Sequence, residues 1–88
     1  MLLHLSPTYE FAIDQDAGKK RLIIFKDGDE FVCRKESPRK LLDFLKSDFA
    51  HLFKGRLQLI KTKSSIYFQV KGEVVGEISS GNFQRLLS

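Results

Sequence analysis

Two stretches of this chain share one pattern, and the second lies 44 residues after the first, which is half of the 88-residue length. In each stretch, an apolar run leads into a turn, Asp27-Gly28 or Lys71-Gly72, and a second apolar run follows. Glycine readily adopts the positive φ of tight hairpin turns, so both stretches are typical of β-hairpins. Each then reaches a serine and a leucine pair, Leu41-Leu42 or Leu86-Leu87. This repetition predicts one hairpin-plus-helix unit used twice.

The ends of the other elements are indicated by turn and capping residues. Ser37-Pro38 begins a helix, because serine can cap free backbone N–H groups and proline suits the first helical position. Gly55 is placed to end that helix in a left-handed conformation. Ser80 begins a shorter helix, and residues 14–18 and 61–64 form loops or turns. The predicted strands cover residues 9–13, 21–26, 29–35, 56–61, 65–70 and 73–78.

The main helix carries apolar residues at intervals of three and four, the pattern of an amphipathic helix. Its predicted stripe is Leu41, Leu42, Leu45, Phe49, Leu52 and Phe53. We expect this stripe, with Phe49 at its centre, to pack on the apolar face of both hairpins.

The fold class that these elements predict is α+β, with an antiparallel sheet and one main amphipathic helix. Three strands and a helix occur twice in one small domain over residues 1–88, with residues 9–53 and 55–88 as candidate repeat units. This order resembles the architecture of small folds that bind single-stranded nucleic acid with repeated sheet-plus-helix units. Likeness at that level does not determine function.

The net charge of +4 is concentrated in the second part of the chain. Residues 1–53 hold nine basic and nine acidic side chains, whereas residues 54–88 hold six basic and two acidic ones. Between Phe49 and Gly72 there is no carboxylate at all. Clustered charge of one sign attracts a partner of the other sign, so we expect an anionic ligand.

An aromatic residue accompanies these cations. Strand alternation predicts that Tyr67 shares a sheet face with Arg56, Gln58 and Gln69. A ring on a sheet can stack a nucleobase while lysine and arginine hold phosphates. In the alternative interpretation, the face is simply solvated and Tyr67 covers Gly76. The candidate nucleic-acid-binding residues are Arg56, Gln58, Lys61, Lys63, Tyr67 and Lys71.

The first hairpin suggests a different function. Pairing across its turn places Ile24 opposite Phe31 and leaves Ile23, Phe25 and Val32 on the outward side. A strand pair that is apolar on both sides needs a second cover, which could be residues 1–5, the last helix or another subunit. The alternative function is therefore protein–protein interaction, as a homodimer or as a small inhibitor or adaptor.

Patterns of catalysis, metal binding and membrane insertion are missing from the sequence. His4 and His51 have no partner at metal-ligand spacing, and the lone Cys33 excludes an internal disulfide. No acid, base and nucleophile set predicts an enzyme. The apolar start is too short for a signal peptide, and no run approaches the roughly 20 apolar residues that span a bilayer. We therefore expect a cytoplasmic, non-enzymatic protein without metal, cofactor or membrane partner.

Overall fold

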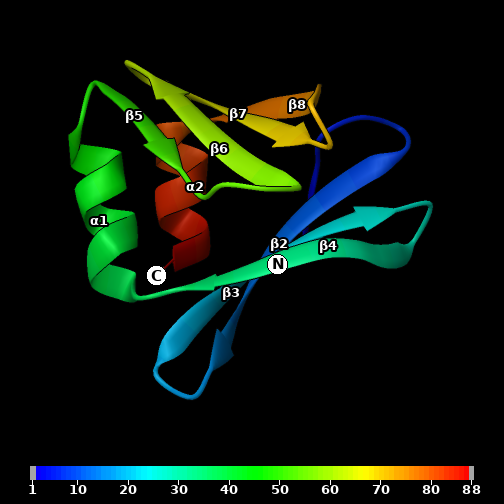
Figure 1. Cartoon of the computed structure of the whole chain (residues 1–88), viewed down its shortest axis with the longest axis horizontal. Helices are drawn as coiled ribbons and strands as arrows, with labels where there is room; N and C mark the ends of the chain where they lie inside the picture. Colours follow the sequence, from blue (N-terminus) through cyan, green and yellow to red (C-terminus); the bar gives the residue numbers. More distant parts are fainter. Residues whose placement is uncertain (1, 88) are drawn as a thin grey trace.

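The computed structural model describes residues 2–87 and contains two four-stranded antiparallel sheets, each followed along the chain by a helix (Figure 1). The first sheet has the order β1 (Leu2–His4), β2 (Tyr9–Asp16), β3 (Lys19–Lys26), β4 (Asp29–Glu36), and α1 (Pro38–Lys46) follows. The second has the order β5 (Phe49–Leu52), β6 (Leu57–Thr62), β7 (Ser65–Val70), β8 (Glu73–Ser79), and α2 (Ser80–Leu87) follows. The α+β class is confirmed. Each half has one strand more than expected.

The first sheet has a longer second strand and one more strand than the sequence indicated. β2 runs to Asp16, and only Ala17 and Gly18 connect it to β3. Both turn residues have positive φ, 49° and 84°, which is the geometry of a tight two-residue hairpin. The expected loop over residues 14–18 was therefore wrong, because alanine at a left-handed position gives no warning of such a turn. β1 adds a short edge strand, with Leu3 opposite Phe11.

The start of α1 agrees with the sequence, but its end does not. The Ser37 hydroxyl accepts a hydrogen bond from the Lys40 amide at 3.3 Å, as a capping residue should. The helix ends at Lys46, and Phe49 begins β5, which pairs with β6. Phe49 is 68% exposed, so its expected place at the centre of the core was wrong. Leu41 and Phe44 are the buried residues of this helix.

A β-bulge in each half changes which side chains share a face. In β4 the bulge places Ile24 opposite Val32 instead of Phe31, so Val32 turns toward the core. In β8 the bulge places Phe68 opposite Gly76 and leaves Val75 as the extra residue. Phe31 and Val75 hold equivalent positions after their turns, so the two hairpins share this irregularity.

The core lies between the sheets and is closed at one end by both helices (Figure 1). Phe11, Phe68 and Phe83 are fully buried, and the ring of Phe11 lies 4.4 Å from Phe68 and 5.9 Å from Phe83. These three rings come from β2, β7 and α2, so one aromatic cluster joins the two halves.

Gly76 marks a second close contact between the halves. A Cβ atom added there would lie 2.6 Å from the Cβ of Leu5, in the segment between β1 and β2. Only glycine allows the N-terminal segment to approach β8 so closely.

Candidate nucleic-acid interface

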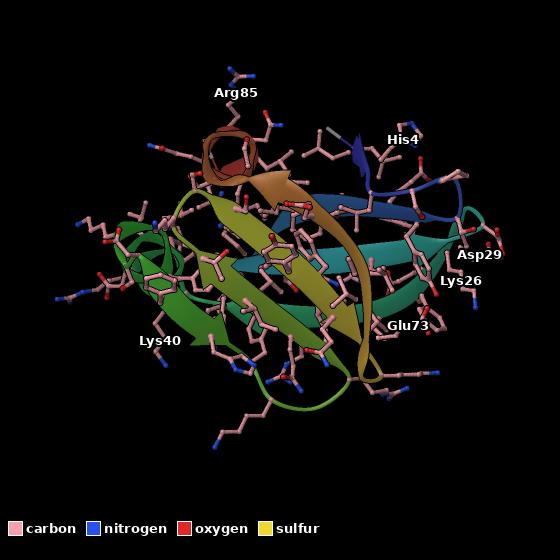
Figure 2. All side chains as sticks on the ribbon, turned by 90° about the horizontal axis from the view of Figure 1, so that it is seen from above. His4, Lys26, Asp29, Lys40, Glu73 and Arg85 are labelled. Atoms are coloured by element: carbon pink, nitrogen blue, oxygen red, sulfur yellow. The ribbon has the colours of Figure 1, made fainter. Side chains whose placement is uncertain are left out.

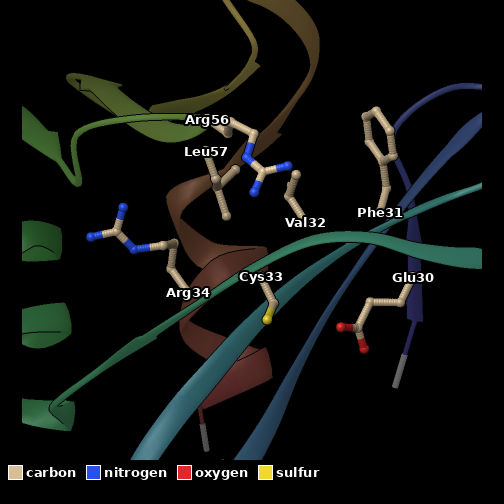
Figure 3. A pocket seen from close by; sticks show the side chains of 7 residues that line it. All are labelled: Glu30, Phe31, Val32, Cys33, Arg34, Arg56 and Leu57. Atoms are coloured by element: carbon tan, nitrogen blue, oxygen red, sulfur yellow. The ribbon is translucent and has the colours of Figure 1, made fainter.

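An open hollow of about 380 Å³ lies where β4 passes β6, and we call it the seam (Figure 3). One wall is residues 30–34 of β4, an edge strand whose pairing partner among the described residues is β3. The other wall is Arg56 and Leu57, at the entry of β6. Figure 3 shows the Arg56 side chain extending toward Val32 from this second wall. A guanidinium group thus faces the edge of the first sheet.

Phenylalanine rings hold further cations at the seam. The Lys71 ammonium lies 4.6 Å from the centroid of the Phe31 ring, and the Lys26 ammonium lies 5.0 Å from it. The guanidinium of Arg34 lies 4.9 Å from the centroid of Phe53 and also donates to the Lys54 carbonyl. Each cation–π contact at an exposed site stabilises by about 0.5–1 kcal/mol. These contacts hold long, flexible cationic side chains against rings at the seam and beside it.

Two carboxylates near the seam, Glu30 and Glu36, accept hydrogen bonds. Glu30 lines the hollow and forms an ion pair with Arg21, and this hydrogen bond raises the pKa of Arg21 above its ordinary value. Glu36 lies farther along β4, where one of its oxygens accepts from the Ser37 amide at 3.1 Å. The lining of the seam therefore carries two arginines, Arg34 and Arg56, against one carboxylate that is paired with Arg21. Glu36 lines the neighbouring hollow with Arg34 and keeps its negative charge.

The structure divides the six candidate nucleic-acid residues into separate groups. Arg56 and Lys71 lie at the seam. Tyr67 lies on the outward face of the second sheet, opposite Ile60 and Glu77 and not opposite Gly76 as expected. Gln58 is in the neighbouring row of that face, and Lys63 is exposed at the β6–β7 turn. The expected grouping of Arg56 with Tyr67 was wrong, because Arg56 precedes β6 and turns toward β4.

Lys61 does not lie on the candidate binding surface. The β6–β7 connection is a two-residue turn, Lys63-Ser64, so Lys61 pairs with Ile66 on the inward face. Lys61 is only 4% exposed, and its ammonium donates to the Ser47 carbonyl at 2.6 Å and to the Lys63 carbonyl. It therefore ties the end of α1 to the β6–β7 turn and is not available to a ligand.

The expected apolar patch on the first sheet is largely covered. Ile23 is 1% exposed and Val32 is 8% exposed, and Val32 belongs to the core cluster. Phe25 is half-buried and pairs with Glu30. The outward placement of Val32 was wrong, because the bulge in β4 reverses its direction.

Arg34, Phe31 and Phe53 were not recognised as site residues from the sequence. Arg34 lies outside the carboxylate-free window, and Phe53 was assigned to the helix stripe. A bulge has no reliable sequence signal, so the position of Phe31 at the seam depended on the tertiary structure.

Neither a metal-ligand cluster, nor a membrane-spanning helix, nor a similar known protein was found for the described part of the chain. Within residues 2–87, no group of three or more His, Cys, Asp or Glu side chains could hold a metal ion. In the same range, neither helix has the length and apolar character needed to cross a membrane. Comparisons with protein families, with curated proteins and with solved structures found no significant match.

Proposed function

We propose that the protein is a non-catalytic binding module for single-stranded nucleic acid, and that the seam holds the phosphates of the strand. The observation that carries the proposal is the pair Arg34 and Arg56 in one open hollow. Among the described lining residues Glu30 is the single carboxylate, and it is paired with Arg21. Arginine presents a planar fork of donors that matches phosphate geometry, so two of them in a groove favour a phosphate ligand.

The rings at the seam favour an unpaired strand over a duplex. Phe31 lines the seam, and the ammonium groups of Lys26 and Lys71 lie over its ring. Phe53 lies next to the seam, where the Arg34 guanidinium covers its ring. Unpaired bases stack on aromatic rings and on guanidinium planes, whereas the bases of a duplex are already stacked on one another. A duplex would therefore use the charges of the seam but not its rings.

Binding of short DNA and RNA oligomers, measured by fluorescence anisotropy at low and moderate salt, tests this function. Affinity should fall steeply with salt, because phosphate contacts release counterions. Arg56→Ala should weaken binding to every sequence and lower the salt slope by about one for the phosphate contact it removes. Lys63→Ala is the matched control, since it removes an equal charge from the exposed β6–β7 turn.

Two results would contradict the proposal in different ways. If Lys63→Ala and Tyr67→Ala weaken binding and Arg56→Ala does not, the ligand uses the outward face of the second sheet. If no oligomer binds even at low salt, nucleic acid is the wrong ligand. Direct binding of a fluorescently labelled peptide rich in aspartate and glutamate, followed by anisotropy, would then test whether the seam holds an acidic protein segment instead.

A further inference from the structure

The seam continues beyond Arg34. This side chain also lines a second hollow of about 520 Å³, together with Glu36, His51, Phe53 and Lys54, so its lining holds two cations and one carboxylate. His51 in turn lines a third hollow of about 260 Å³ between α1 and β5. Three hollows thus share their boundary residues and form one track along the surface. Lys26 lies near one end of the molecule and Lys40, on α1, near the other (Figure 2).

We propose that the third hollow is a base-binding subsite for the strand held at the seam, with His51 as the residue that contacts the base. This inference rests on the proposed function. It adds residues that the proposed phosphate site does not use, and it implies that a longer strand binds more tightly than one that fills the seam alone.

The chemistry of the third hollow suits a base better than a phosphate. Lys40 is the cation that lines it, and Asp43, on the same helix, balances that charge. The half-buried Ala50 and Leu52 supply apolar surface, and Phe44, which is 5% exposed, also lines the hollow. A phosphate gains little from a balanced pair of charges, whereas a planar base can bury its apolar faces there.

The direction of His51 is determined by a short chain of hydrogen bonds. The Gln58 amide nitrogen donates to the Gly55 carbonyl at 3.0 Å, which leaves the amide oxygen for His51. That oxygen lies 2.7 Å from Nε2 of His51, so Nε2 must carry the proton in the neutral ring. Nδ1 is then the acceptor nitrogen of the exposed imidazole, and we assign to it a donor group of the base. Adenine and cytosine present such amino donors. Gln58 is therefore a positioning residue that acts through His51.

The length of the strand follows from the size of the molecule. Its longest dimension is 31 Å. A stacked strand advances about 3.4 Å per nucleotide, so about nine nucleotides would span the whole surface. An oligomer of about four nucleotides lies at the lower end of known single-strand site sizes and would occupy the seam alone.

Anisotropy with oligomers of about four and about nine nucleotides tests the subsite. His51→Ala should weaken the longer oligomer about fivefold or more, the loss expected for one base contact, and leave the shorter one unchanged. His4→Ala is the matched control, because it removes the other histidine, which lies far from Lys40 (Figure 2). Gln58→Leu should weaken only the longer oligomer, and the double variant with His51→Ala should lose no more than His51→Ala alone. Circular dichroism checks that each variant is folded.

The outcomes separate the two proposals. If wild type binds both oligomers and His51→Ala affects neither, or affects both equally, the subsite is refuted and the seam remains. Additive losses for His51→Ala and Gln58→Leu would refute the positioning role of Gln58. If wild type binds neither oligomer at low salt, the proposed function is refuted and the subsite with it.

Discussion

Replacing Phe83 with alanine should destabilise the protein more than a comparable change in α1 or β5. The ring of Phe83 is fully buried on α2, 5.9 Å from the ring of Phe11 and 6.2 Å from that of Phe44. It therefore joins α2 to β2 and to α1 at once. Removal leaves a cavity among groups that belong to three elements, and these cannot all move inward to fill it.

The expected loss is about 3–5 kcal/mol, the usual range for a buried phenylalanine replaced by alanine. A chain of 88 residues has a free energy of unfolding of about 4–13 kcal/mol. The loss is therefore about the whole free energy of unfolding at the lower end of this range and less than half of it at the upper end. Phe83→Leu retains most of the volume and should lose no more than about 1.5 kcal/mol, so it gives a measurable folded variant.

Urea denaturation followed by circular dichroism measures these values, and Phe49→Ala is the matched control. Phe49 is 68% exposed on β5, so its removal should change stability by no more than about 0.5 kcal/mol. A loss below about 1 kcal/mol for Phe83→Ala would refute the assigned core. If Phe49→Ala lowers the free energy of unfolding more than Phe83→Ala does, the buried helix stripe centred on Phe49 that the sequence predicted would be supported instead.

Three further changes test other parts of the structure. Gly76→Ala would place a Cβ atom 2.6 Å from that of Leu5, so thermal or urea denaturation should show a loss of about 1–3 kcal/mol. The loss should be smaller when Leu5→Gly is also present, and an unchanged loss would argue against this contact. Lys61→Ala removes a buried ammonium that donates to two carbonyls, so stability should fall by about 1–3 kcal/mol. The affinity of this variant for oligonucleotides should equal that of wild type. A loss of affinity in the folded variant would show that Lys61 contacts the ligand. The Asp16 carboxylate accepts a hydrogen bond from the Lys35 ammonium at 2.8 Å, which lowers the pKa of Asp16 below its ordinary value. This pair stabilises the fold above the ordinary pKa and loses that effect as the pH falls through the lowered one. An NMR titration should show the pKa of Asp16 rising in Lys35→Ala, and no rise would mean that the ion pair does not form in solution.

The candidate site was only partly predictable. The carboxylate-free window contains Arg56 and Lys71, which the structure places at the seam. Strand alternation then grouped Arg56 with Tyr67, but alternation applies only within a strand and Arg56 precedes β6. Lys61 was misplaced because a turn of two residues, and not four, connects β6 to β7. A shift of one position moves a side chain to the other face of a sheet.

Local chemistry in the sequence was enough to place the tight turns at Asp27-Gly28 and Lys71-Gly72, the start of α1 at Ser37-Pro38 and the similar pattern of the two halves. Each of these depends on residues within a few positions of one another. Other features depended on partners far along the chain. The segment 49–52 joined β6 as a strand although its apolar spacing suited a helix. In the same way, the bulges and the inward turn of Lys61 arose from pairing and from buried hydrogen bonds. Helical spacing states only which residues could share a face, and the free energy of packing against the rest of the molecule decides whether they do.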